Sequence, residues 1–184
     1  MVKLQQTLLT FSVVLFIVFL NINTALASND TFIKKTINGT VFIKTDIGLG
    51  FFIKPNGLIA INYHVLAGAK KISLALYNGE TFEVKHVYMT KDMLNKDLSL
   101  LKINKDNCQS LLLADTLPSR SSKVFAIGHP HGHKWGFSEG FLSAKDNIEN
   151  GREVIQISAD LSPGNSGGAI CSDKGEVIGN SYLS

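Results

Sequence analysis

The glycine-rich stretch from Asp160 to Ile170 contains Ser166, the residue of this chain best suited to nucleophilic chemistry. The stretch has the sequence DLSPGNSGGAI. Glycine adopts backbone conformations that strain other residues, and it lets a substrate approach the main chain closely. Such a loop can direct two backbone N–H groups to one point beside the Ser166 hydroxyl, a geometry that stabilises an oxyanion in acyl transfer. An ordinary tight turn before a strand has the same composition, so the interpretation depends on a base and a carboxylate elsewhere.

Two residues far upstream are candidates for these roles. His64 follows the apolar run Leu58–Asn62, and an imidazole at a rigid strand end suits a general base; a purely structural histidine is the alternative. Asp97 directly precedes the apolar run Leu98–Ile103. It is either a surface charge at a strand end or a half-buried carboxylate that orients an imidazole. The chain order His64, Asp97, Ser166 is that of the chymotrypsin-type triad.

The elements that would position these residues are short β-strands. Apolar runs separated by Gly, Asn and Asp predict an all-β sandwich or barrel, and no stretch of residues 28–184 has a helical apolar stripe. A polar gap at residues 104–107 is the natural link between two halves. The expected strands are Thr40–Lys44, Gly50–Lys54, Leu58–Asn62, Lys71–Tyr77, Thr81–Val84, Leu98–Ile103, Lys123–Ile127, Phe141–Ala144, Glu153–Ile157, Ala169–Ile170 and Glu176–Gly179.

The first residues have the pattern of a secretory signal peptide. Lys3 precedes an apolar run from Leu8 to Leu20, and the segment ends in Ala25-Leu26-Ala27. We expect residues 1–27 to be a signal peptide cleaved after Ala27, although an uncleaved anchor is the alternative. The domain at 28–184 is then secreted or periplasmic, with no stable membrane anchor after cleavage.

Charge and the remaining reactive side chains exclude several classes of function. The formal net charge of +3 is too small to indicate a nucleic-acid partner. Cys108 and Cys171 could form a disulfide in an oxidising compartment, but the apolar residues before Cys171 favour a buried thiol. His129, His131 and His133 alternate in one segment. A fourth ligand is missing there, so we expect no metal.

Several ordered blocks of the chain resemble the HtrA/Deg family of trypsin-like serine proteases. They follow the order of that family from about Gly48 to Gly179, a range that is most of the mature chain. The blocks are Gly48–Ile53, Pro55–Ile59, Asn62–Ala69, Asp97–Lys102, Ala126–Pro130 with Gly140–Ala144, and Pro163–Gly168.

This resemblance implies an all-β, chymotrypsin-like double β-barrel. The protease domain would cover 28–184, with a first barrel at about 31–104 and a second at about 120–184. His64 would be the general base, Asp97 its orienting carboxylate and Ser166 the nucleophile. The N–H groups of Gly164 and Ser166 would form the oxyanion hole. The implied activity is that of a serine endopeptidase that acts on proteins or peptides, including misfolded proteins. No metal or organic cofactor is implied, and a homo-oligomer is possible.

Asp160 adds a hypothesis about substrate selection. In trypsins an aspartate six residues before the nucleophile forms the floor of the primary specificity pocket and pairs with Arg or Lys of the substrate. HtrA-type proteases instead tend to accept small aliphatic side chains. A loop carboxylate that faces water is the third interpretation of Asp160.

The chain departs from the family pattern after Ser166. The strands that close the second barrel are expected to be missing, as is any PDZ domain. A truncated protease, a short family member or a chain completed by a partner's strand would each account for this. The alternative function is therefore a catalytically impaired module that binds peptides, acts like a chaperone or is completed by a partner.

Overall fold

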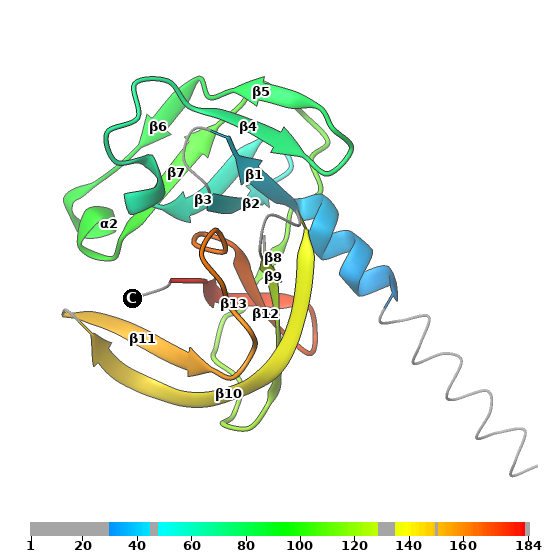
Figure 1. Ribbon diagram of the computed structural model, residues 1–184, viewed down its shortest axis with the longest axis vertical. Coiled ribbons are helices and arrows are strands. Elements are labelled where there is room, and N and C mark those ends of the chain that lie inside the picture. The colour runs from blue at the N-terminus through cyan, green and yellow to red at the C-terminus, as the bar shows by residue number, and fades with distance from the viewer. Residues whose placement is uncertain (1–29, 45–47, 129–134, 150, 183–184) are drawn as a thin grey trace, which may run out of the picture. The chain divides into compact units, whose positions relative to one another are not determined.

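The structure is a computed structural model and describes residues 30–44, 48–128, 135–149 and 151–182 (Figure 1). The chain divides into two compact units, residues 1–34 and residues 35–184. The expected signal peptide and its cleavage site, like His129, His131 and His133, lie outside the described residues. Among the residues that are described, no helix is both long and apolar enough to cross a membrane.

The first sheet holds seven antiparallel strands and carries the segments around His64 and Asp97. Figure 1 shows this sheet curling back on itself. Its spatial order is β5-β4-β1-β2-β3-β7-β6. The strands are β1 (Thr40–Ile43), β2 (Gly48–Lys54), β3 (Leu58–Asn62), β4 (Ser73–Leu76), β5 (Thr81–Glu83), β6 (His86–Tyr88) and β7 (Leu98–Lys102).

The core of the first sheet explains why its central strands are almost entirely apolar. Residues 48–52 of β2 and 59–62 of β3 are buried on both strand faces, as expected of a sheet that curls around its own side chains. The fully buried side chains with the largest volume include Phe52, Ile59 and Leu101. This packing fixes the ends of β3 and β7, from which His64 and Asp97 project.

The second sheet holds six strands and carries the segment before Ser166. Its order is β11-β10-β9-β12-β13-β8. The strands are β8 (Leu112–Leu113), β9 (Lys123–Gly128), β10 (Gly136–Glu149), β11 (Arg152–Ile157), β12 (Ala169–Ser172) and β13 (Glu176–Asn180). Strand β10 is long and strongly curved (Figure 1), because it pairs first with β9 and then with β11 across two register shifts.

The all-β class and the two curled half-barrels agree with the sequence-based prediction. The local differences have physical reasons. Residues 30–39 are helical, where the sequence indicated only β-type runs. A second helix, α2 (Lys91–Asn95), has no apolar stripe because none of its residues is buried. Strand β10 is much longer than the expected Phe141–Ala144. The prediction from sequence missed its outer part because the polar residues there do not alternate with apolar ones.

Cys108 and Cys171 are both buried and both free thiols, so the structure has no disulfide between them. Burial raises the pKa of Cys171 to about 12, partly offset by an interaction with the side chain of Thr36. Below that pH the Cys171 thiol therefore keeps its proton in the folded chain, while the same thiol in the unfolded chain loses it at a lower pH.

The Cys171 thiol is expected to make folding less favourable as the pH rises. Above about pH 9 the unfolded state loses this proton while the folded state keeps it, so stability falls, by about 2 kcal/mol at pH 10.5. Urea unfolding at pH 8 and pH 10.5 measures the difference. A Cys171→Ala variant serves as the reference, because it lacks this titration but shares every other one. Equal losses in the two proteins would contradict the expectation.

Candidate active site

His64 begins a one-turn 3-10 helix, η1 (His64–Leu66), directly after β3. Val65 and Leu66 of the same turn are buried in the core of the first sheet. These two apolar side chains hold the turn against the sheet, while the His64 side chain remains 43% exposed. The local sequence therefore fixes the backbone of His64 and leaves its imidazole accessible.

Asp97 is held in an unusual backbone conformation between α2 and β7. Its φ is 53°, in the left-handed region that costs most non-glycine residues free energy. Its N–H donates to the Leu94 carbonyl at 3.0 Å, and its own carbonyl accepts from Tyr63 N at 3.0 Å. The side chain is only 4% exposed. This conformation turns the carboxylate back towards the end of β3.

The Asp97 carboxylate and the His64 ring are in direct contact. His64 Nδ1 lies 2.6 Å from Asp97 Oδ2, and the backbone N–H of His64 donates to Oδ1 at 2.9 Å. Asn62 Nδ2 donates to Oδ2 at 3.0 Å. An ionised carboxylate can only accept, so Nδ1 carries the ring proton and Nε2 is left as the basic nitrogen.

Asn62 was not anticipated as part of this site. It is buried at the end of β3 and also donates to the Asp97 backbone carbonyl at 3.2 Å. The available signal was a single amide side chain at the end of an otherwise apolar run. Its bonds supplement those of His64, so that both oxygens of a nearly buried carboxylate are satisfied.

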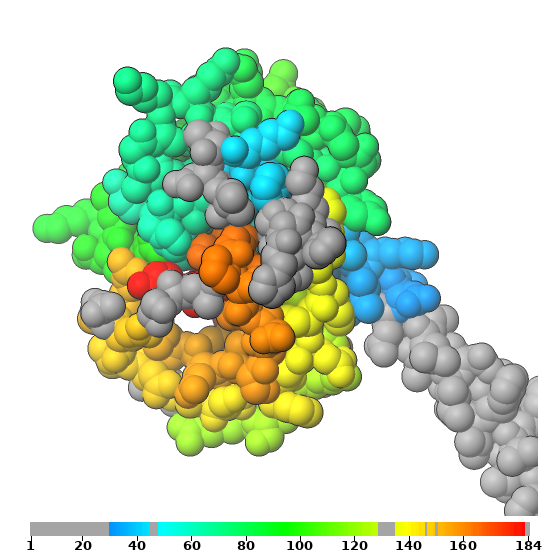
Figure 2. All heavy atoms as spheres, in the orientation of Figure 1, coloured from blue at the N-terminus to red at the C-terminus, as the bar shows by residue number. Residues whose placement is uncertain are grey.

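Ser166 lies in a tight turn whose backbone is held by both sheets. Leu49 N of β2 donates to the Ser166 carbonyl at 2.8 Å, and Gly167 N donates to Ser181 O at 2.9 Å. In Figure 2 the orange atoms that include the segment around residue 165 lie below the cyan and green atoms of the first sheet and beside the yellow atoms of β10. The Ser166 residue itself is half-buried.

Gly48 brings the Ser166 turn close to the His64 turn. A Cβ at Gly48 would lie 2.5 Å from a methyl carbon of Val65 and 3.2 Å from the Ser166 carbonyl oxygen. The residue after His64 and the backbone of Ser166 therefore approach the same glycine. No hydrogen bond joins the Ser166 hydroxyl to the His64 ring within the described part of the chain. Nucleophile–base contacts of this kind are often loose without substrate.

The two N–H groups predicted to form an oxyanion hole lie in the same turn. Gly164 has a φ of 96°, and in the described ranges neither its N–H nor that of Ser166 donates to a protein acceptor. Neighbouring backbone amides, in contrast, donate to protein acceptors: Asn165 N to Ser162 O at 3.0 Å and Gly168 N to Asn165 O at 2.9 Å. Both candidate donors therefore lack a protein acceptor among the described residues, as the predicted oxyanion hole requires.

The structure gives less information about Asp160 and about metal binding. Asp160 is exposed, and its backbone carbonyl accepts from Ser138 Oγ at 2.8 Å. Its role in substrate selection stays a prediction. No group of three or more His, Cys, Asp or Glu side chains is placed to hold a metal ion among the residues described.

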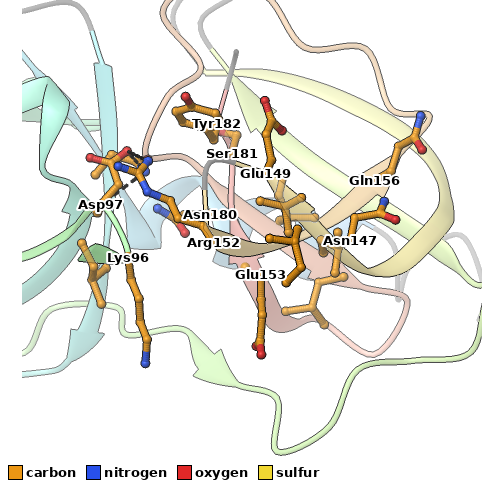
Figure 3. A pocket seen from close by; sticks show the side chains of 18 of the residues that line it. Lys96, Asp97, Asn147, Glu149, Arg152, Glu153, Gln156, Asn180, Ser181 and Tyr182 are labelled. Carbon is orange, nitrogen blue, oxygen red and sulfur yellow. Dashed lines mark hydrogen bonds and ion pairs between the residues drawn. The ribbon is translucent and has the colours of Figure 1, made fainter. Parts of the chain in front are cut away.

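A cavity of about 1300 Å³ lies beside Asp97, lined by residues of the α2–β7 region and of the second sheet (Figure 3). Polar residues that line it include Asn62, Asp97, Arg152 and Tyr182, and isoleucine residues of the second sheet line it as well. The Tyr182 ring makes an edge contact with the His64 ring, with centroids 5.8 Å apart. Neither Arg152 nor Tyr182 had been singled out from the sequence, because nothing in their spacing relates them to Asp97.

The double half-barrel, the paired imidazole and carboxylate and the glycine-rich serine turn define a chymotrypsin-like protein. Residues 48–179 match the family described as the trypsin-like peptidase domain, and the chain belongs to this family. A solved structure, the serine endoprotease from Yersinia pestis, superposes with a TM-score of 0.75 at 26% identity. That match covers 84% of this chain and 57% of the other.

Within this family the chain is similar to Deg-type serine endoproteases. It is 34% identical to the serine endoprotease DegS of Haemophilus influenzae over 169 residues, which is 85% of this chain and 47% of that protein. It is 36% identical over 141 residues to a probable periplasmic DegP-like serine endoprotease of Halomonas elongata, covering 74% and 29% of the two chains. The chain thus spans about half the length, or less, of these curated relatives. The predicted HtrA/Deg resemblance is confirmed.

Proposed function

We propose that this chain is a serine endopeptidase that cleaves peptide bonds through an acyl-enzyme on Ser166. The observation that carries the proposal is the 2.6 Å contact between His64 Nδ1 and Asp97 Oδ2, beside a serine turn with two available N–H donors. A carboxylate on Nδ1 fixes the ring tautomer and leaves Nε2 to accept the serine proton. The relatives' names, which describe serine endoproteases, support the same reaction.

The proposed reaction uses only groups of this chain and water. His64 Nε2 takes the proton of Ser166 Oγ as the oxygen attacks the substrate carbonyl, and Asp97 stabilises the resulting imidazolium. The N–H groups of Gly164 and Ser166 donate to the oxyanion; one such donor typically contributes about 10²–10³ in rate. The intermediate expels the amine, which takes the proton from His64. Water then attacks the acyl-enzyme while His64 Nε2 takes its proton. The proton passes to Ser166 Oγ as the carboxylic acid product leaves.

The substrate class and location extend this proposal. Relatives that are named periplasmic and the predicted signal peptide together favour a secreted or periplasmic enzyme. We infer that unfolded proteins are its substrates, because a peptide bond must reach the Ser166 turn in an extended conformation. The selectivity for side chains, including the role of Asp160, remains part of the prediction from sequence.

Covalent labelling tests the proposed function directly. A fluorophosphonate probe is expected to modify Ser166 and no other serine, as located by peptide mass mapping, and Ser166→Ala is the matched control. The same preparation should degrade reduced, carboxymethylated lactalbumin faster than the disulfide-bonded protein. A folded sample that neither reacts with the probe nor degrades the unfolded protein would instead fit the peptide-binding alternative and would refute the enzyme.

A further inference from the structure

Arg152, at the start of β11, places its guanidinium against the candidate catalytic carboxylate. Its Nη1 lies 3.6 Å from Asp97 Oδ2, and its Nε donates to the Asn95 carbonyl at 3.1 Å. The guanidinium carbon lies over the Tyr182 ring, 5.8 Å from the centroid. Figure 3 shows the Arg152 side chain reaching to Asp97. Three contacts, two with the segment from the end of α2 to β7 and one with Tyr182, therefore hold one cation beside this anion.

The position of the carboxylate does not depend on Arg152. Oδ2 is bonded to Asn62 Nδ2 and to the His64 ring, and Oδ1 to the His64 N–H. The 3.6 Å separation from Nη1 exceeds the usual N–H···O range but is within that of an ion pair. The main effect of Arg152 on the site is therefore its charge rather than its geometry.

This charge acts where water screens it only partly. The Asp97 side chain is 4% exposed and that of Arg152 is 32% exposed. Two charged residues of the nearby helix and its C-cap offset each other, since Lys96 Nζ pairs with Asp92 at 3.2 Å. The remaining cation of that helix, Lys91, is exposed to water. Glu149 and Glu153 line the same cavity and are labelled in Figure 3. The Arg152 guanidinium and the His64 ring both contact the same oxygen, Asp97 Oδ2.

We propose that Arg152 restrains the general base by neutralising Asp97. This inference rests on the proposed function, in which the Ser166 proton moves to His64 Nε2. With Asp97 alone, the imidazolium formed by that transfer completes a neutral pair. With Arg152 also on Oδ2, the three groups carry a net positive charge, and like charges in a poorly screened site repel. Arg152 thus acts through Asp97.

The test compares the neutral variant Arg152→Gln with Arg120→Gln. The latter removes the other arginine of the chain, which is exposed. Arg152→Gln is expected to raise kcat, and the rate of fluorophosphonate labelling, about three- to tenfold, with KM unchanged. Arg120→Gln should match the wild type. Provided the wild type is active, a rate for Arg152→Gln at or below the wild-type rate overturns the inference.

Proton NMR provides a readout that does not need activity. The His64 Nδ1 proton should move downfield in Arg152→Gln, because the carboxylate no longer shares its charge with the guanidinium and accepts more strongly. Arg120→Gln should leave the resonance in place. An unmoved resonance in folded Arg152→Gln overturns the inference. If no protein reacts with the probe, the proposed enzyme fails, while the resonance still decides the role of Arg152.

Discussion

Replacing Ser166 with alanine is expected to lower kcat by roughly 10⁵–10⁶-fold, the scale on which serine hydrolases depend on their nucleophile. Adding His64→Ala to that variant should cause almost no further loss, because the base has no function without the hydroxyl it activates. Asp97→Asn alone should cost about 10⁴-fold, since an amide at this position favours the wrong ring tautomer. Progress curves on an unfolded protein substrate measure all three variants.

Two observations would contradict this expectation. Losses from Ser166→Ala and His64→Ala that multiply in the double variant would mean that the two residues act independently rather than as a unit. Full activity in Asp97→Asn would mean that the 2.6 Å contact with His64 Nδ1 has no part in the reaction. Circular dichroism of each variant provides the control for folding.

Gly167→Ala is expected to disrupt the Ser166 turn and to destabilise the protein by about 2–5 kcal/mol. Gly167 has a φ of 85°, and an added Cβ would lie 2.0 Å from the Leu49 carbonyl oxygen. A left-handed alanine costs about 1–2 kcal/mol, and overpacking typically adds about 1–3 kcal/mol. Because the obstructing atom is backbone of β2, relief of the contact must move the turn itself. Urea unfolding and the rate of fluorophosphonate labelling measure the two consequences.

Gly79→Ala is the matched control for this substitution. Gly79 has nearly the same φ, 89°, but its added Cβ would meet nothing within 4 Å. The control therefore contains the conformational cost without the contact, and it lies in the turn between β4 and β5. The two variants should differ by the contact cost, and only Gly167→Ala should lose labelling. Equal stabilities of the two variants would show that the approach to Leu49 carries no energy.

The strands and the position of His64 could be predicted from local sequence. Runs such as Leu58–Asn62 are apolar, short and bounded by turn residues, and these properties depend on near neighbours in the chain. The same reasoning failed where local sequence is ambiguous. Residues 30–39 became a helix, and the polar outer part of β10 became a strand because β11 pairs with it.

The contacts around Asp97 could not be predicted in this way. The left-handed conformation of Asp97 depends on the end of α2, and Asn62 meets the carboxylate only because β3 and β7 are neighbours in register. Arg152 reaches the same oxygen from the other sheet. Nothing in a spacing of more than fifty residues encodes such a meeting.

Adjacent residues suffice to predict the β-rich class and the glycine-rich turn, and the order His64, Asp97, Ser166 can be read directly from the chain. The folded chain adds the short contact between His64 and Asp97, the guanidinium beside Asp97 and, among the described residues, the lack of a protein acceptor for the N–H groups of Gly164 and Ser166. The physical reason is that these properties depend on distance and screening between segments. Chain folding sets both of those, and residue type alone sets neither.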